Sequence, residues 1–213
     1  MLHILIADDH SIMRRGVRAL LEDHPGWEVC GEASNGREAI EMAERLRPEI
    51  CIVDVSMPEL NGIETTRRIR ATLPGTEVVV LTVHDSEDLA ASVLAAGARG
   101  YVLKADVAQD LTAAVEALAR HTPFFTRRVA DSVVDRLVHG KPAAQGVLGL
   151  LTPREREIVQ LIAEGQRTHR IATVLGISDK TVETHRTAIL RKLHLKSVVD
   201  VVRFAIRNGI VPA

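Results

Sequence analysis

The first 120 residues alternate five times between a short apolar run and a longer stretch with helical periodicity. The apolar runs cover residues 3–7, 27–30, 50–53, 78–81 and 101–103. The helical stretches cover residues 11–22, 36–47, 63–72, 86–96 and 107–120. Strands separated by helices are joined by right-handed crossovers, which place helices on both faces of a parallel sheet. The sequence therefore predicts a doubly wound α/β domain with a five-stranded parallel sheet.

Polar side chains follow four of these strands, at the edge where parallel strands end together. Asp8 and Asp9 follow the first strand, Asp54 the third, Thr82 the fourth and Lys104 the fifth. A single Asp at a strand end more often forms a turn or caps a helix, but ligands of open α/β sheets bind at this edge. Neighbouring carboxylates repel one another unless a cation joins them, and oxygen ligands with room for water suit Mg²⁺. A phosphoryl group is the anion that such a cation, Lys104 and Thr82 would hold beside Asp54.

The two halves of the chain carry opposite charges, although the net charge of the 213 residues is -1. Residues 1–120 contain 12 Lys and Arg against 20 Asp and Glu, or -8, whereas residues 148–213 contain 11 against 6, or +5. The length suits two domains, and the opposite charges indicate different partners for them. Aromatic residues make up 2% of the chain, which leaves few side chains for stacking on single-stranded nucleic acid.

The two cysteines, Cys30 and Cys51, both fall inside predicted strands. This position favours buried thiols in a reducing compartment over a disulfide. No stretch approaches the ~18 apolar residues of a membrane span, and the nine histidines show no metal-ligand spacing. We therefore expect a cytoplasmic protein without a membrane partner.

Residues 121–149 are expected to connect the two domains. Thr126 can cap a helix with an apolar stripe that would pack on the first domain or contribute to a dimer. This stripe consists of Val129, Val133, Val134, Leu137 and Val138. Three glycines and a proline within residues 140–149 predict a flexible tether.

Residues 150–213 predict a small all-α domain. Thr152 and Glu155 form a capping box with Pro153 at the first helical position, opening a helix that ends at Gly165. A short second helix stops at Gly176, and Ser178 caps a longer third helix. Its inward positions are Val182, Ile189, Leu190 and Leu193, and its outward positions are Lys180, Glu183, Thr184, Thr187 and Arg191.

This arrangement predicts a helix-turn-helix, in which the third helix presents a small, polar and basic face sized for the major groove. On spacing alone, a small helical bundle that does not bind DNA is an equal alternative. A fourth helix is expected over residues 197–208. Its apolar positions exceed what one core face needs; they are Val198, Val201, Val202, Ala205 and Ile206.

The first domain resembles the receiver domain of two-component response regulators, a flavodoxin-like fold. The residues that carry the resemblance are Asp8, Asp9, Asp54, Met57-Pro58, Gly62, Thr82, Tyr101 and Lys104. The resemblance implies that Asp54 accepts phosphate from a sensor histidine kinase and that Lys104 contacts this phosphate. It also implies that Mg²⁺ is bound by Asp9, Asp54 and the backbone carbonyl of Ser56, with Asp8 acting through water. Thr82 and Tyr101 would form a switch pair, and Gly62 is expected in a turn with positive φ.

The second domain is similar to the LuxR-type helix-turn-helix, and the whole chain to the NarL/FixJ subfamily of response regulators. Matching segments are Leu151 to Glu157, Glu164-Gly165, Ile171-Ala172, Ile177-Ser178, Thr181-Val182 with His185, and Arg191 to Leu193. The resemblance implies contacts with double-stranded DNA by Lys180, Thr181, Glu183, Thr184, His185, Arg186, Thr187, Arg191 and Lys192. The sequence departs from the family at residues 167–170, which read Arg-Thr-His-Arg.

These DNA contacts are expected to differ in kind. Glu183 would accept a hydrogen bond from a cytosine amino group, whereas Arg186, Arg191 and Lys192 would contact phosphates. For His185, partly buried packing is an equal alternative to a base contact.

The function expected from these features is a transcription regulator controlled by phosphorylation, which forms a homodimer on activation. RNA polymerase is a further candidate partner, and slow self-dephosphorylation is the only enzymatic step expected. A rival hypothesis is a Mg²⁺-dependent phosphatase, but Ser56 stands where that chemistry wants a second Asp. A constitutive DNA binder would lack the acidic pair or Lys104, and this chain keeps both.

Overall fold

The computed structural model describes residues 1–126, 129 and 147–211. The chain divides into two compact units, a larger N-terminal unit and a smaller C-terminal unit. No helix in this described part of the chain is both long and apolar enough to cross a membrane.

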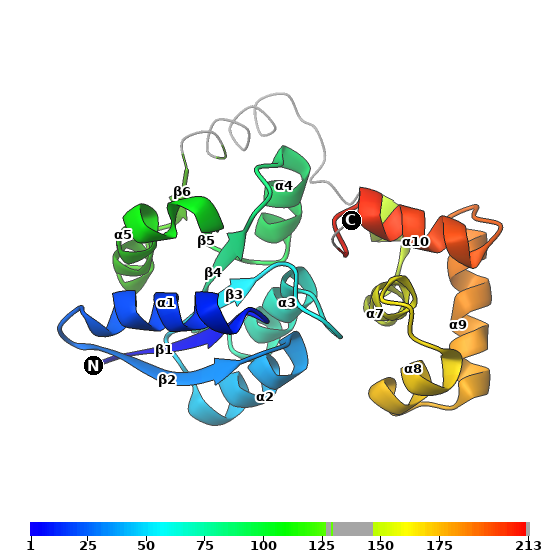
Figure 1. Cartoon of the computed structure of the whole chain (residues 1–213), viewed down its shortest axis with the longest axis horizontal. Coiled ribbons are helices and arrows are strands. Elements are labelled where there is room, and N and C mark those ends of the chain that lie inside the picture. Colours follow the sequence, from blue (N-terminus) through cyan, green and yellow to red (C-terminus); the bar gives the residue numbers. More distant parts are fainter. Residues whose placement is uncertain (127–128, 130–146, 212–213) are drawn as a thin grey trace. The chain divides into compact units, whose positions relative to one another are not determined.

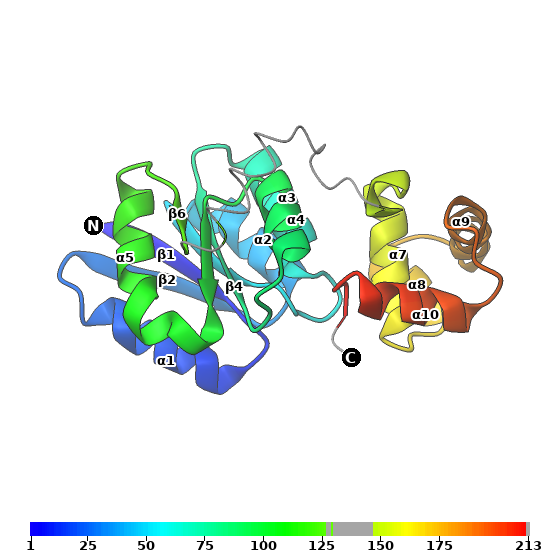
Figure 2. The same ribbon diagram turned by 90° about the horizontal axis from the view of Figure 1, so that it is seen from above.

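The N-terminal unit contains a parallel sheet with the strand order β2-β1-β3-β4-β5-β6 (Figure 1). Its strands are β1 (Leu2–Ala7), β2 (Trp27–Ala33), β3 (Ile50–Asp54), β4 (Glu77–Thr82), β5 (Gly100–Leu103) and β6 (Phe124–Phe125). Its α-helices are α1 (Ser11–Glu22), α2 (Gly36–Leu46), α3 (Gly62–Thr72), α4 (Glu87–Ala95) and α5 (Val107–Ala119). Helices α1 and α5 cover one face, and α2, α3 and α4 cover the other (Figure 2). The predicted doubly wound parallel fold is confirmed.

The central strands are buried on both faces because alternate side chains enter two different cores. In β3, Ile50 and Ile52 pack in the core under α1 and α5, whereas Cys51 and Val53 pack in the core under α2, α3 and α4. An uninterrupted apolar run is the expected sequence of such a strand. The thiol of Cys51 is buried, that of Cys30 is partly buried, and both are free.

The prediction of five strands is wrong by one, because the short strand β6 extends the sheet. Phe124 lies opposite Gly100 and Phe125 opposite Tyr101 in a parallel pair with β5. Two residues are too few to show the alternation that marks a strand in a sequence.

The connecting segment is described only in part. Val129 is helical and buried in the core under α2, α3 and α4, and the rest of the predicted apolar stripe lies outside the described residues. The predicted tether ends in a 3₁₀ turn, η2 (Val147–Leu150). Residues 140–146 of the tether also lie outside the described residues.

The C-terminal unit consists of the helices α7 (Pro153–Ala163), α8 (Thr168–Leu175), α9 (Asp179–Lys192) and α10 (Val198–Arg207). Thr152 and Glu155 form the predicted capping box at the start of α7. Gly176 ends α8 with a φ of 64°, a conformation that glycine adopts without strain. Ser178 then caps α9, and Val182 and Ile189 face the core shared by the four helices. The predicted helix-turn-helix, α8 and α9, is confirmed.

Candidate functional site

Three acidic residues meet where β1 and β3 end. Asp54 is the last residue of β3, and its side chain is 1% exposed. Asp8 follows β1 and is also 1% exposed, whereas Asp9 keeps 33% of its side-chain surface. The parallel register of β1 and β3 brings these strand ends together, as the sequence predicts.

Lys104 joins the two buried carboxylates. It opens the 3₁₀ turn η1 (Lys104–Asp106) directly after β5. Its Nζ lies 2.7 Å from Asp8 Oδ2 and 2.9 Å from Asp54 Oδ2. Burial alone would lower the pKa of Lys104, but its hydrogen bonds to Asp8 and Asp54 outweigh burial and raise the pKa above its ordinary value.

The electrostatic balance differs at Asp54. Burial raises the pKa of its carboxyl group, and the charge of Asp8 raises it further. Contacts with Lys104 and with the backbone N–H of Ser56 lower this pKa but do not cancel the effect of burial. Asp54 is therefore a buried carboxylate that needs additional positive charge to remain ionised beside Asp8.

The acidic residues fit a hard divalent cation. Ligand atoms of Asp8, Asp9, His10 and Asp54 all lie within 4.8 Å of one another. Apart from the Lys104 ammonium, Oδ2 of Asp8 and Oδ2 of Asp54 meet no hydrogen-bond donor among the described residues. The carboxylate oxygens of Asp8, Asp9 and Asp54, of which Asp9 is open to water, match the ligands that Mg²⁺ prefers.

His10 is a member of this cluster that the sequence prediction missed. Its backbone N–H donates to Asp8 Oδ1 at 2.8 Å, and its Nδ1 lies 2.7 Å from Asp9 Oδ1. Its position directly after the acidic pair is the only sequence signal that marks it.

Thr82 and Tyr101, the predicted switch pair, contact the same backbone residue. The hydroxyl of Thr82 accepts a hydrogen bond from the N–H of His84 at 3.0 Å. The Tyr101 hydroxyl donates to the carbonyl oxygen of His84 at 2.7 Å. The Tyr101 ring is buried, and this burial raises its pKa to about 12. The loop after β4 thus connects the site to Tyr101.

Gly62 is required for a different reason from the one predicted. Its φ is not in the positive range; the positive φ of this loop belongs to Glu59. A Cβ atom on Gly62 would overlap the carbonyl oxygen of Asp54. The glycine therefore permits the close approach of α3 to the end of β3.

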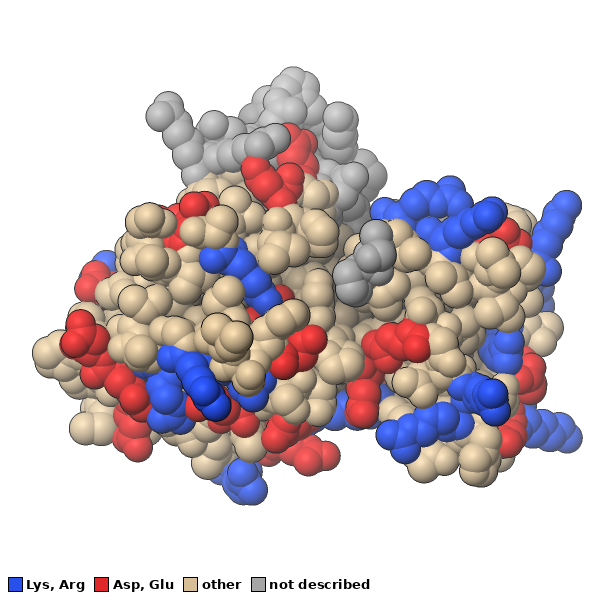
Figure 3. All heavy atoms as spheres, in the orientation of Figure 1, with Lys and Arg blue, Asp and Glu red and all other residues tan. Residues whose placement is uncertain are grey.

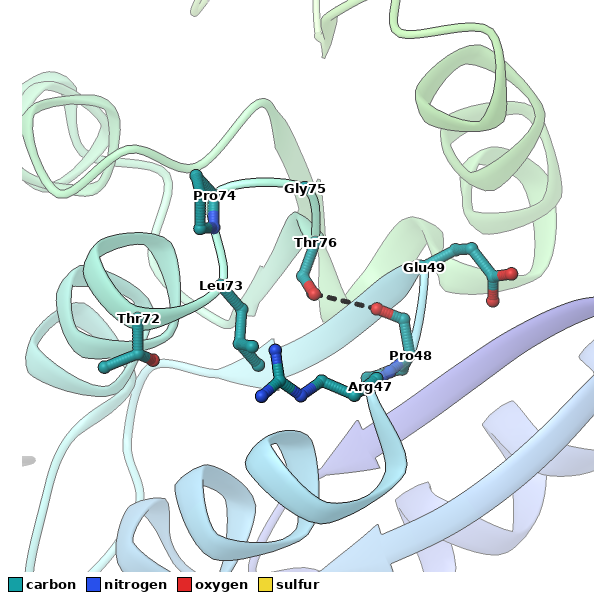
Figure 4. Close-up of a pocket in the computed structure, with 8 residues that line it drawn as sticks. All are labelled: Arg47, Pro48, Glu49, Thr72, Leu73, Pro74, Gly75 and Thr76. Carbon is teal, nitrogen blue, oxygen red and sulfur yellow. Dashed lines mark hydrogen bonds between the residues drawn. The ribbon is translucent and has the colours of Figure 1, made fainter.

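A surface cavity of about 280 Å³ lies at the opposite edge of the sheet, before β3 and β4 (Figure 4). It is lined by Arg47, Pro48, Glu49, Thr72, Leu73, Pro74, Gly75 and Thr76. The Thr76 hydroxyl donates to the Pro48 carbonyl at 2.8 Å, shown dashed in Figure 4. This cavity lies away from the acidic cluster and contributes nothing to it.

The residues predicted for DNA contact divide into two groups on α9. Five are exposed: Lys180, Glu183, Thr184, Thr187 and Arg191. Four are partly buried: Thr181, His185, Arg186 and Lys192. In Figure 3, Lys and Arg side chains lie mainly along the margins of the visible face of the C-terminal unit, with some Asp and Glu side chains between them.

Two of the predicted phosphate contacts already have partners within the C-terminal unit. Lys192 Nζ lies 2.6 Å from Glu155 Oε2 in the capping box. Burial acts to raise the pKa of Glu155, but Lys192 and the Thr152 N–H outweigh burial and lower it. Arg186 contacts Thr168 and Glu183. Arg191 is thus the predicted phosphate contact that is most available, because it is exposed.

Comparison with known proteins places both units in described families. Residues 4–116 match the response regulator receiver domain, and residues 149–205 match the luxR family of bacterial regulatory proteins. The transcriptional regulatory protein LiaR of Bacillus subtilis (strain 168) is 38% identical over 211 residues, covering 99% of this chain and 100% of LiaR. The nitrate/nitrite response regulator protein NarP of Escherichia coli (strain K12) is 37% identical over 196 residues, covering 92% of this chain and 90% of NarP.

A solved structure shows the same architecture. RcsB from Salmonella enterica serovar Typhimurium, bound to the promoter rprA in the presence of the phosphomimetic BeF3−, matches with a TM-score of 0.62 and 27% identity. The match covers 95% of this chain and 97% of that chain. The chain therefore belongs to the response regulators of the NarL/FixJ type, which are transcription regulators rather than dedicated enzymes and join a receiver domain to a LuxR-type helix-turn-helix.

Proposed function

We propose that Asp54 is the phosphoacceptor of this response regulator. The observation that supports this is a buried carboxylate at the carboxyl edge of the sheet, 2.9 Å from the ammonium of Lys104. An Asp54 oxygen would attack the phosphorus of a phosphohistidine on a sensor histidine kinase. The P–N bond breaks, and its electron pair stays on the imidazole nitrogen, which takes up a proton.

Lys104 would then contact the transferred phosphoryl group, and the Thr82 hydroxyl would donate a hydrogen bond to one of its oxygens. Asp9, Asp54 and the Ser56 carbonyl would hold Mg²⁺, with Asp8 acting through water. When bound, the cation supplies positive charge that offsets the negative charge on the reacting oxygens. Hydrolysis of the acyl phosphate by water would return Asp54 to its free form slowly.

The proposal predicts that Asp54→Asn abolishes labelling by acetyl phosphate, because the amide has no nucleophilic carboxylate while its shape is nearly unchanged. Labelling of the wild-type chain should require Mg²⁺ and stop on addition of EDTA. Mass spectrometry of the labelled peptides measures both effects. Incorporation at another residue in the Asp54→Asn variant, at the wild-type level, would disprove the assignment.

We further propose that the C-terminal unit binds double-stranded DNA through α9 and that phosphorylation produces a homodimer. The proposed boundaries are residues 1–120 for the receiver, 121–149 for the connection and 150–213 for the DNA-binding domain. Double-stranded DNA, a sensor histidine kinase and RNA polymerase are the proposed partners, in the cytoplasm.

Helix α10 provides one candidate dimer surface. Val201 and Ala205 are buried in the core of the unit, but Val198, Val199 and Ile206 keep 42%, 58% and 38% of their surface exposed. A cluster of exposed apolar residues on one helix is a frequent feature of protein interfaces. Two-fold pairing of this kind is also what two half-sites on DNA require.

A further inference from the structure

Three polar side chains form a closed triangle between the start of α8 and the outward face of α9. Thr168 Oγ1 donates to Glu183 Oε1 at 2.8 Å. Arg186 Nη1 donates to the same Oε1 at 3.1 Å and to Thr168 Oγ1 at 2.9 Å. The triangle fixes the Glu183 carboxylate from both helices of the helix-turn-helix.

The position of Glu183 requires an explanation, because a carboxylate on a DNA-binding face is repelled by the phosphates. The triangle uses one oxygen, Oε1, while the Glu183 side chain remains 56% exposed. The second oxygen, Oε2, takes no part in the triangle and can accept a hydrogen bond from outside.

We propose that Glu183 is a specificity-determining residue that accepts a hydrogen bond from a cytosine amino group in the major groove, and that Thr168 is the residue that positions it. Glu183 is the fifth residue of α9, near the helix end that reads base edges in helix-turn-helix proteins. In the major groove, the usual partner of a Glu carboxylate is the amino group of cytosine, which donates a hydrogen bond to it. This inference rests on the proposed binding of DNA by α9.

The triangle also assigns a role to Arg186. Its guanidinium, 25% exposed, neutralises Glu183 and holds the carboxylate in one orientation. A side chain held in its bound orientation loses less conformational entropy when the complex forms. Arg186 therefore acts by orienting Glu183 and not by contacting a phosphate.

The test selects binding sites from a pool of double-stranded DNA with randomised positions, using the full-length chain with acetyl phosphate and Mg²⁺. The wild-type chain should select a G·C pair at one position of each half-site. Glu183→Gln should shift this position from cytosine toward adenine, which a carboxamide prefers. Thr168→Val should weaken the preference for cytosine there about tenfold, and both variants should keep the preferences at the other positions.

Thr173→Val is the matched control, because Thr173 is exposed on α8 and, among the described residues, its hydroxyl donates only to the His169 carbonyl oxygen in its own helix, at 3.0 Å. This variant should select the wild-type site. Arg186→Ala should change the same base position and leave the salt dependence of DNA affinity nearly unchanged, whereas loss of a phosphate contact would reduce the salt slope by about one.

Wild-type preference at every position in both Glu183→Gln and Thr168→Val would overturn the inference, and would leave the triangle as a contact that only stabilises the fold. A wild-type chain that selects no DNA would instead refute the proposed function itself. Since Glu183 is exposed, the Glu183→Gln variant is expected to fold. If Thr168→Val unfolds, the base preference of Glu183→Gln alone still shows whether Glu183 reads this position.

Discussion

Asp54 combines burial with a like charge at Asp8 and an opposite charge at Lys104. Burial is the strongest of these influences, and the pKa of Asp54 is raised in the folded chain. A raised pKa means that the fold favours the protonated form. The stability that the fold gains from protonated Asp54 is therefore fully present below the ordinary pKa of Asp. It is lost as pH rises through the raised pKa of Asp54 in the folded state.

At neutral pH, Asp54 should thus make the receiver unit less stable than a side chain of the same shape that does not titrate. We predict that Asp54→Asn increases the free energy of unfolding at pH 7 by about 1 kcal/mol, because it removes a buried carboxyl group that lies beside Asp8. Replacements of functional residues that are unfavourable for the fold often have an effect of this size. The gain should shrink as the pH is lowered toward the ordinary pKa of Asp. Urea titrations followed by the fluorescence of Trp27, the single tryptophan, report on this unit.

The exposed Glu41 on α2 offers a control. Glu41→Gln should change stability little at any of these pH values. A gain from Asp54→Asn that is equal at acid and neutral pH would show that the carboxylate charge is not its cause.

At the scale of secondary-structure elements, the junction between β3 and α3 depends on Gly62. We predict that Gly62→Ala destabilises the receiver by more than about 3 kcal/mol, because the new Cβ would overlap the backbone of Asp54. Gly16 in α1 is a matched control, since a Cβ there meets no atom of the described residues within 4 Å beyond the backbone of its own helix. Gly16→Ala should stabilise the chain by about 1 kcal/mol through helix propensity. Equal effects of the two substitutions would contradict the close approach of α3.

Helix α9 should obtain much of its affinity for DNA from charge. We predict that Arg191→Ala weakens binding to all DNA sequences about equally and reduces the salt slope by about one, because its exposed guanidinium would contact a phosphate. Fluorescence anisotropy titrations at several salt concentrations measure both quantities. A loss confined to one operator would indicate that Arg191 reads bases.

Local patterns were enough to predict most elements of both units. The strand-end residues Asp54 and Thr82, and the capping box of Thr152 and Glu155, follow from short-range rules and lie where the sequence indicates. Most of the missed features depend on contacts between separate segments; His10 is the exception, because its partners Asp8 and Asp9 directly precede it. Strand β6 pairs with β5, and the need for glycine at position 62 comes from the nearby carbonyl oxygen of Asp54. The ion pair between Lys192 and Glu155 joins residues that are 37 positions apart.

At the scale of the whole molecule, the acidic receiver and the basic C-terminal unit suit different partners. A receiver that is net negative does not favour contact with DNA phosphates, whereas the +5 charge of residues 148–213 does. One recognition helix reads only a few base pairs, so useful specificity against a genome requires two half-sites and a dimer. In this account phosphorylation of Asp54 shifts the receiver between two states, through the Thr82, His84 and Tyr101 contacts, and the dimer follows.

Sedimentation velocity of the full-length chain, with and without acetyl phosphate and Mg²⁺, tests whether phosphorylation of Asp54 produces the dimer. A DNA titration under the same two conditions measures the affinity of each state. We expect a monomer without the phosphodonor, a dimer with higher DNA affinity in its presence, and an Asp54→Asn variant that stays monomeric in both conditions. A wild-type chain that gains DNA affinity on phosphorylation while remaining monomeric would contradict the dimer mechanism.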